Sequence, residues 1–91
     1  MAHTCGLMDQ EVLHLLIRRK IRNRRLPNDG IRAAWSTPSD GETCDACDTV
    51  LTQDQLLMEA VLLGGKRSIR MHIRCFQIWD LEKRRTLKPN S

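Results

Sequence analysis

The stretch Cys44-Asp45-Ala46-Cys47, followed after 24 residues by His72-Ile73-Arg74-Cys75, decides the fold of this chain. Each half places two metal-binding side chains with two residues between them, which is the spacing found in tetrahedral zinc sites. Two such pairs supply all the donor atoms of a tetrahedral shell and leave no position for water or substrate. The sequence therefore predicts one structural zinc ion bound by Cys44, Cys47, His72 and Cys75.

The size and composition of the chain fit a single small domain that benefits from such a metal. The chain has 91 residues, with one Phe, two Trp and no Tyr, so its core contains few large side chains. A structural zinc contributes on the order of 10–16 kcal/mol of apparent binding free energy to folding. That amount is comparable to the whole free energy of unfolding of a small domain.

The cysteines are expected to be reduced in a cytoplasmic protein. The apolar run Val12 to Ile17 follows the acidic Asp9 and Glu11, and arginines come after it, which reverses the order of a secretion signal. No stretch is long and apolar enough to span a membrane. Paired cysteines in a reducing compartment more often hold metal than form disulfides, which favours the zinc interpretation.

The chain divides into four predicted segments. A flexible tail covers 1–7, and helical spacing of apolar residues predicts an amphipathic basic helix over 8–26, with Asp9 as its N-cap. Turn-forming residues make 27–42 a predicted connector. The remaining segment, 43–88, is predicted to be the zinc-finger domain.

The residues between the two ligand pairs fit either of two structures. A Thr-to-Gln capping pattern and a terminal glycine make 52–63 compatible with a helix. The same residues fit a strand that turns at Gly64-Gly65 into a second strand over 68–71. A hairpin returns the chain to within ligand distance, so we predict the hairpin. A helix is then predicted from His72 to Leu87, with both ligands of the second pair on its first turn.

A ligand pair on a turn, a hairpin and a second pair at the start of a helix resemble the treble-clef zinc-finger superfamily over about residues 42–86. The pattern is also similar to small uncharacterised bacterial proteins in which a Cys-x2-Cys turn precedes a His-x2-Cys helix. The resemblance implies a small α+β domain stapled by zinc, with an N-terminal helix, a zinc turn, a β-hairpin and a C-terminal helix. The second half-site resembles LIM-type modules, which mediate protein contacts. The interval between the pairs is longer here, and no second zinc site follows.

Positive charge is concentrated near the end of the first predicted helix. The net charge is +4, and six cations fall within eight residues: Arg18, Arg19, Lys20, Arg22, Arg24 and Arg25. This cluster is a candidate surface for nucleic-acid phosphates. No aromatic side chains interleave with the cluster to stack on bases, so such binding would have little sequence specificity.

Three functions follow from these features. The leading hypothesis is a non-catalytic, regulatory interaction module that binds a partner protein through Leu16, Ile21, Trp35 and Trp79. A Trp in the position of Trp79, however, more often covers the metal site from within the core. The first alternative is a nucleic-acid-binding finger that uses the cationic cluster. The second is a redox dithiol at Cys44 and Cys47, against which nearby carboxylates argue because they raise a thiol pKa.

An enzyme is not expected. The sequence offers no Ser-His-acid arrangement and no glycine-rich phosphate loop in the required context. The predicted zinc shell is closed, whereas catalytic zinc keeps an open position. We therefore expect neither catalysis nor a small-molecule substrate.

Overall fold

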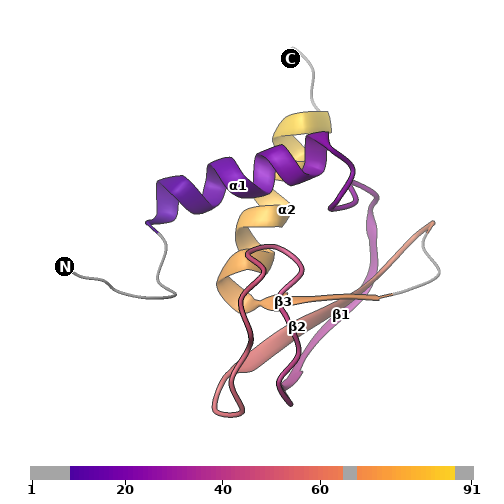
Figure 1. The fold of residues 1–91 in the computed structure, drawn as a ribbon. Helices are drawn as coiled ribbons and strands as arrows, with labels where there is room; N and C mark the ends of the chain where they lie inside the picture. Colours follow the sequence, from indigo (N-terminus) through magenta and orange to yellow (C-terminus); the bar gives the residue numbers. More distant parts are fainter. Residues whose placement is uncertain (1–8, 65–67, 88–91) are drawn as a thin grey trace.

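The computed structural model describes residues 9–64 and 68–87 as two helices and a three-stranded antiparallel sheet (Figure 1). The predicted tail over 1–7 lies outside the described residues. The sheet order is β1-β2-β3. In chain order the elements are α1 (Gln10–Arg22), β1 (Ile31–Pro38), β2 (Leu56–Leu62), β3 (Ser68–His72) and α2 (Ile73–Leu87). The small α+β fold class predicted from the sequence is confirmed by these two helices and the antiparallel sheet.

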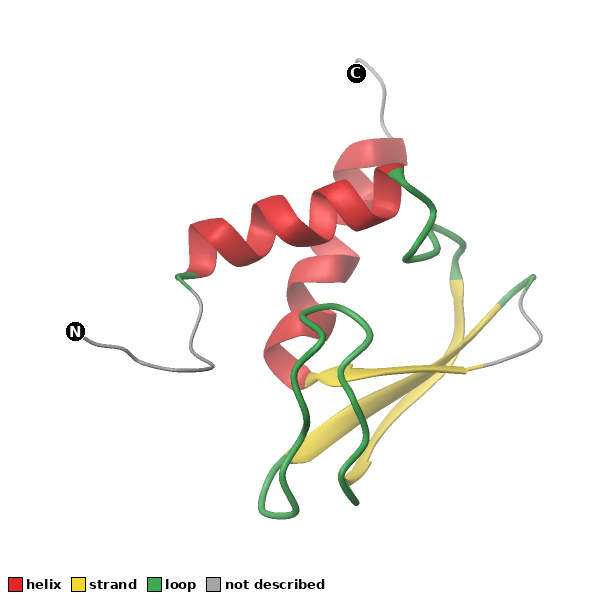
Figure 2. Ribbon diagram, in the orientation of Figure 1, coloured by secondary structure: helices red, strands yellow, loops and turns green. Residues whose placement is uncertain are grey.

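Helix α2 lies between α1 and the sheet and contributes to the core on both sides. α1 crosses α2, and α2 packs against β2 and β3 (Figure 1). The fully buried Trp79 of α2 meets Ile17 from α1 and Met71 from β3 in one apolar cluster. A long loop, green in Figure 2, joins β1 to β2 and carries the first ligand pair. The N-terminal helix is therefore an integral part of the domain.

The C-terminal end of α1 closes through a Schellman motif in which an arginine takes the place usually held by glycine. Arg24 has φ 63°, and its N–H donates to the carbonyl of Ile21 at 3.1 Å. The N–H of Arg25 donates to the carbonyl of Lys20 at 2.8 Å, which completes the motif. The turn directs Leu26 into the core. α1 thus ends at Arg22, four residues before the predicted end at 26.

Replacing Arg24 with glycine is expected to stabilise the domain by about 1 kcal/mol, because only glycine adopts this left-handed conformation without a steric cost. Thermal denaturation of the metal-loaded protein measures the effect. Arg22→Gly is the matched control, since it places glycine inside the helix and should destabilise. A lower melting temperature for Arg24→Gly would contradict the Schellman geometry.

The predicted connector is wrong over 31–38, because the structure places strand β1 there. β1 pairs antiparallel with β2, from Ile31 opposite Leu62 to Pro38 opposite Leu56, with a bulge between Ile31 and Ala33. Most of its residues are exposed on both faces of the sheet. A strand with so little burial shows no alternation of apolar and polar residues, which is the pattern that identifies strands in a sequence.

The predicted hairpin is confirmed, since β2 and β3 pair antiparallel from Leu57 opposite His72 to Val61 opposite Ser68. The capping pattern that favoured a helix forms only one turn. There the N–H of Thr52 donates to the side-chain oxygen of Gln55 at 2.9 Å, and the N–H of Gln55 donates to the carbonyl of Thr52 at 3.0 Å. The chain then extends into β2 because Leu57, Ala60 and Leu62 are buried there.

Candidate metal centre

The first two ligand side chains lie on a tight turn over residues 43–50, which we call the ligand turn. A bridge between Thr43 and Val50 closes the turn, and the N–H of Cys44 donates to the carbonyl of Thr49 at 2.8 Å. The N–H of Asp48 donates to the carbonyl of Cys44 at 2.9 Å, which Asp48 reaches with φ 66°. This folding directs Sγ of Cys44 and Sγ of Cys47 to the same side of the turn.

The second pair lies where β3 meets α2. His72 is the last residue of β3, and α2 begins at Ile73, so only Cys75 stands on the first turn of the helix. The prediction that both ligands share the first turn of the helix is therefore wrong for His72, which belongs to the strand. The strand delivers His72 to the site, and the helix that follows directly delivers Cys75.

The four side chains converge on one small volume. One donor atom from each of Cys44, Cys47, His72 and Cys75 lies within 4.8 Å of all the others. Nδ1 of His72 is 3.4 Å from Sγ of Cys47 and 3.8 Å from Sγ of Cys75. Tetrahedral zinc with Zn–S bonds of about 2.3 Å requires donor separations of roughly 3.7 Å. The donor set therefore fits a tetrahedral metal ion, and the sequence spacing alone identified it.

The thiols are crowded enough to disturb one another's ionisation. Hydrogen bonds with the thiols of Cys44 and Cys75 lower the pKa of Cys47 far below its ordinary value. The hydrogen bond with Cys47 raises the pKa of Cys44, and hydrogen bonds with Cys44 and Cys47 raise that of Cys75. Three thiolates cannot coexist so closely without a cation. A divalent ion would bind the deprotonated sulfurs and release their protons.

The ligand turn also covers the outer edge of β3. The N–H of Asp45 donates to the carbonyl of Arg70 at 2.8 Å, and the N–H of Arg70 donates to Oδ2 of Asp45 at 2.9 Å. These bonds fix the turn beside the strand that ends in His72. The first ligand pair is therefore positioned against the second by the sheet itself.

A lysine of α1 supports the ligand turn from the other side. Nζ of Lys20 donates to Oδ2 of Asp48 at 2.7 Å and to the carbonyl of Asp45 at 3.2 Å. The Lys20 side chain is only 8% exposed. Its ammonium group therefore holds Asp48 in its left-handed conformation and joins α1 to the candidate metal centre.

Replacing Lys20 with methionine is expected to weaken metal binding about tenfold, because groups that orient the ligands usually contribute this much. Competition with a colorimetric chelator measures the affinity. Arg19→Met is the control, since Arg19 is an exposed neighbour on the same helix. Equal affinities for the two variants would show that the tether does not stabilise the centre.

A second polar cluster, which sequence reasoning missed, joins the two helices around Glu82. The Glu82 side chain is buried, and Oε2 lies 2.7 Å from Nδ1 of His14. Nε of Arg18 donates to Oε1 at 2.9 Å, and Nη1 of Arg85 lies 3.7 Å from Oε2. Burial acts to raise the pKa of Glu82, but the hydrogen bonds from Arg18 and His14 outweigh it, so the pKa lies below its ordinary value. The same hydrogen bond raises the pKa of Arg18.

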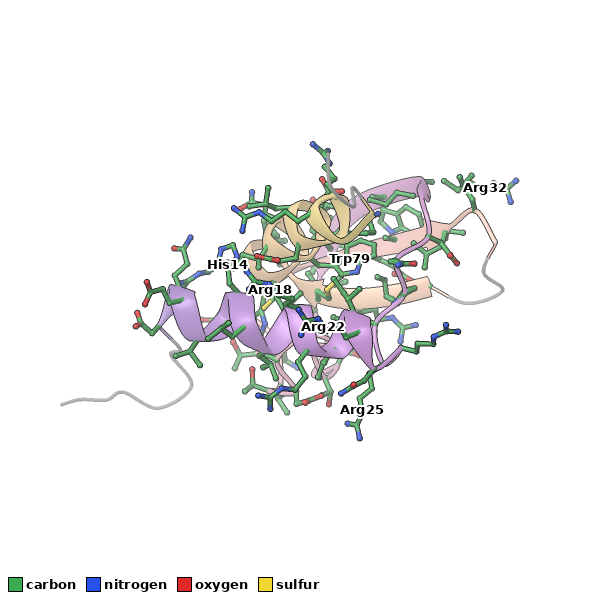
Figure 3. The ribbon with its side chains drawn as sticks, turned by 90° about the horizontal axis from the view of Figure 1, so that it is seen from above. His14, Arg18, Arg22, Arg25, Arg32 and Trp79 are labelled. Carbon is green, nitrogen blue, oxygen red and sulfur yellow. The ribbon has the colours of Figure 1, made fainter. Side chains whose placement is uncertain are left out.

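The six predicted phosphate-binding cations do not form one surface. Arg18 is paired with Glu82 and Lys20 with Asp48, so both are committed within the domain. Figure 3 shows His14 and Arg18 on the side of α1 that faces α2, whereas Arg25 points away from the molecule. Four arginines are exposed and form no ion pair with a residue in 9–64 or 68–87: Arg19, Arg22, Arg24 and Arg25.

The four predicted interaction residues are also divided. Ile21 and Trp79 are buried in the core, so neither side chain is accessible to a partner protein. Leu16 is half-buried, and Trp35 on β1 is 44% exposed. The structure exposes two further apolar side chains of α1 that the sequence prediction did not include, namely Val12 and Leu15. Leu15 lies beside a groove of about 480 Å³ that is also lined by Glu11, His14, Arg18 and Arg85.

The fold and the centre define a small α+β domain with a Cys-Cys-His-Cys cluster that is able to hold a metal ion. No family model, curated protein or solved structure matches the chain. Among the described residues, no helix has the length and apolar character needed to cross a membrane.

Proposed function

We propose that this chain is a non-catalytic interaction module of the cytoplasm, built around one structural zinc ion on Cys44, Cys47, His72 and Cys75. The convergence of four donor atoms from two distant segments carries the proposal. Three sulfurs and one imidazole nitrogen are a ligand set typical of structural zinc, and four protein ligands leave no open position for catalysis. The order of turn, hairpin and helix also agrees with a treble-clef arrangement.

Elemental analysis of protein purified under reducing conditions tests the metal. We expect one zinc per chain, and cobalt(II) titration should give the absorption of a tetrahedral thiolate site. His72→Ala should lose the ion, whereas Cys5→Ser should retain it, because the four proposed ligands complete a tetrahedral shell without Cys5. Folded protein with no bound transition metal would refute the proposal.

A dithiol function at Cys44 and Cys47 has less support than metal binding. Both sulfurs share their small volume with Cys75 and His72, which a simple redox pair does not require. A reversible disulfide in metal-free, folded protein would favour the dithiol. The same elemental analysis therefore separates the two functions.

Partner-protein binding is supported by the apolar side chains that the folded domain leaves exposed. Val12 and Leu15 lie three residues apart on α1 and are 51% and 57% exposed. Adjacent exposed apolar side chains often mark interaction sites. A regulatory partner bound here should resist moderate salt and be lost in Leu15→Asp. The control is Leu81→Asp, which changes an exposed leucine of α2.

Nucleic-acid binding is the second candidate, because the four exposed arginines at the end of α1 are available to phosphates. A gel-shift titration should show an affinity that falls steeply with salt. Replacing Arg19 or Arg22 with alanine should reduce the salt slope by about one each. Arg84→Ala is the control, since Arg84 is paired with Asp80 at 2.9 Å. Absence of binding at low salt would eliminate this function.

A further inference from the structure

The outer edge of β1 is a feature that neither the metal centre nor the core explains. β1 is the end strand of the sheet, and residues 32–36 are exposed throughout. α2 packs on β2 and β3, and neither of the two helices in the described part of the chain covers β1 (Figure 1). Trp35, in the middle of the strand, is 44% exposed. Exposed strand edges with apolar side chains are templates for pairing with another strand.

The pairing with β2 fixes which backbone groups of β1 are free. Ser39 donates its N–H to the carbonyl of Gln55 at 3.1 Å, in line with the register that places Thr37 opposite Leu57 and Trp35 opposite Glu59. Hydrogen-bonding groups alternate in direction along an antiparallel strand. The N–H and C=O groups of Thr37 and Trp35 therefore face β2, and those of Ala34 and Ser36 face outward.

Both ends of this free edge are blocked. Pro38 has no N–H to donate, and the bulge between Ile31 and Ala33 interrupts the ladder at the other end. Only Ala34 and Ser36 remain as outward residues with a donor and an acceptor each. Any added strand must use these two residues.

We propose that β1 pairs antiparallel with β1 of a second copy of this chain, with Ala34 opposite Ser36 of the second copy and Trp35 opposite Trp35. In this register the N–H and C=O groups of Ala34 and Ser36 are all used in both copies. A register centred on Ala34 would bring the bulge into the ladder. A register centred on Ser36 would place Pro38 opposite Ala34 and lose a hydrogen bond. The side chains agree, since the two Trp35 rings would meet at a position without cross-strand hydrogen bonds, where side chains are closest.

Charge at the two ends of β1 also favours a second copy. Arg32 stands at the start of the strand and Asp40 just beyond its end, and neither forms an ion pair with another described residue. Antiparallel pairing brings the start of one strand beside the end of the other. Each Arg32 would then lie near Asp40 of the second copy, which gives two attractive contacts related by the twofold axis.

The assembly would stop at two copies. The outer edge of β3 is already occupied by the ligand turn through Asp45. The six-stranded sheet of a dimer would therefore have no free edge of comparable length. The pairing depends only on β1, but its role as the partner contact of the module rests on the proposed function.

Light scattering of the zinc-loaded full chain over a concentration series tests the dimer. We expect the apparent mass to rise from one chain towards two, because a strand-edge contact is small and should dissociate on dilution. Trp35→Ala should remain monomeric at concentrations where wild type is dimeric. Leu81→Ala, which truncates an equally exposed apolar residue of α2, should dimerise like wild type. A wild type that stays monomeric at every concentration, or a dimer unaffected by Trp35→Ala, would overturn the proposal.

Cysteine cross-linking tests the register with Trp35 left in place. A mixture of Ala33→Cys and Thr37→Cys chains should form a mixed intermolecular disulfide, because residue 33 would face residue 37 of the second copy. Ala33→Cys alone should not, since the two introduced sulfurs would be separated by roughly 13 Å along the strand. Equal cross-linking of the mixture and of Ala33→Cys alone would refute this register. Zinc content, measured on the same samples, shows separately whether the metal proposal holds.

Discussion

Replacing Cys75 with alanine, or removing the metal with a chelator, is expected to abolish cooperative folding of the domain. The four donors join the ligand turn to the junction of β3 and α2. Zinc at such a site contributes on the order of 10–16 kcal/mol of apparent binding free energy. Small domains have only about 5–15 kcal/mol of total stability. Loss of the ion would therefore leave a core that does not sustain the fold.

Circular dichroism and thermal denaturation measure this effect. Wild type treated with chelator should lose its melting transition and regain it when zinc is restored. The control is zinc-loaded Cys5→Ser, which should have the same melting transition as zinc-loaded wild type. Reduced, metal-free protein with an unchanged spectrum and melting temperature would show that the apolar core holds the fold alone.

Replacing Glu82 with glutamine is expected to destabilise the domain by about 2 kcal/mol, because the amide cannot replace the charge-assisted hydrogen bonds that the buried carboxylate accepts. Glu82 accepts hydrogen bonds from Arg18 and contacts His14, so its charge joins α1 to α2. Urea denaturation measures the loss. Glu11→Gln is the control, since Glu11 is an exposed carboxylate of α1 and should change stability by less than about 0.5 kcal/mol.

The contribution of Glu82 to the free energy of unfolding should also depend on pH, and it should fall on acidification. Its pKa in the folded state lies below the ordinary value of 4.5. The ionised form is thus favoured by folding, so the stabilisation is complete above the pKa of the unfolded chain and is lost as pH falls through the lower folded pKa. The difference in stability between wild type and Glu82→Gln should shrink in that acidic range. A difference that grows on acidification would contradict this assignment.

The candidate metal ligands were predictable because the pattern that identifies them lies within short stretches of sequence. Each pair occupies four consecutive residues, and its spacing alone defines how two donors approach one ion. The hairpin followed from the need to return the chain to the same ion. The strand–helix boundary at His72 was not predictable to the residue, since a ligand pair with this spacing is compatible with a junction as well as with a helical turn.

The other features depend on packing that the sequence does not display. β1 has no buried face, so it lacks the alternation that marks a strand. The partners of Glu82 on α1 are 64 and 68 residues away, and only the crossing of α1 over α2 brings them together. Likewise, Lys20 and Arg18 resemble their exposed neighbours in sequence. The orientation of α1 decides which cations point inward.

The dependence of α1 on distant residues has a consequence for synthesis on the ribosome. Its polar contacts reach Asp45, Asp48 and Glu82, and its apolar face packs on α2. The helix therefore leaves the exit tunnel long before any of its contacts exist. A nascent chain must keep that apolar face out of aggregates until α2 has been translated, and premature termination before α2 would yield a product in which that face stays uncovered.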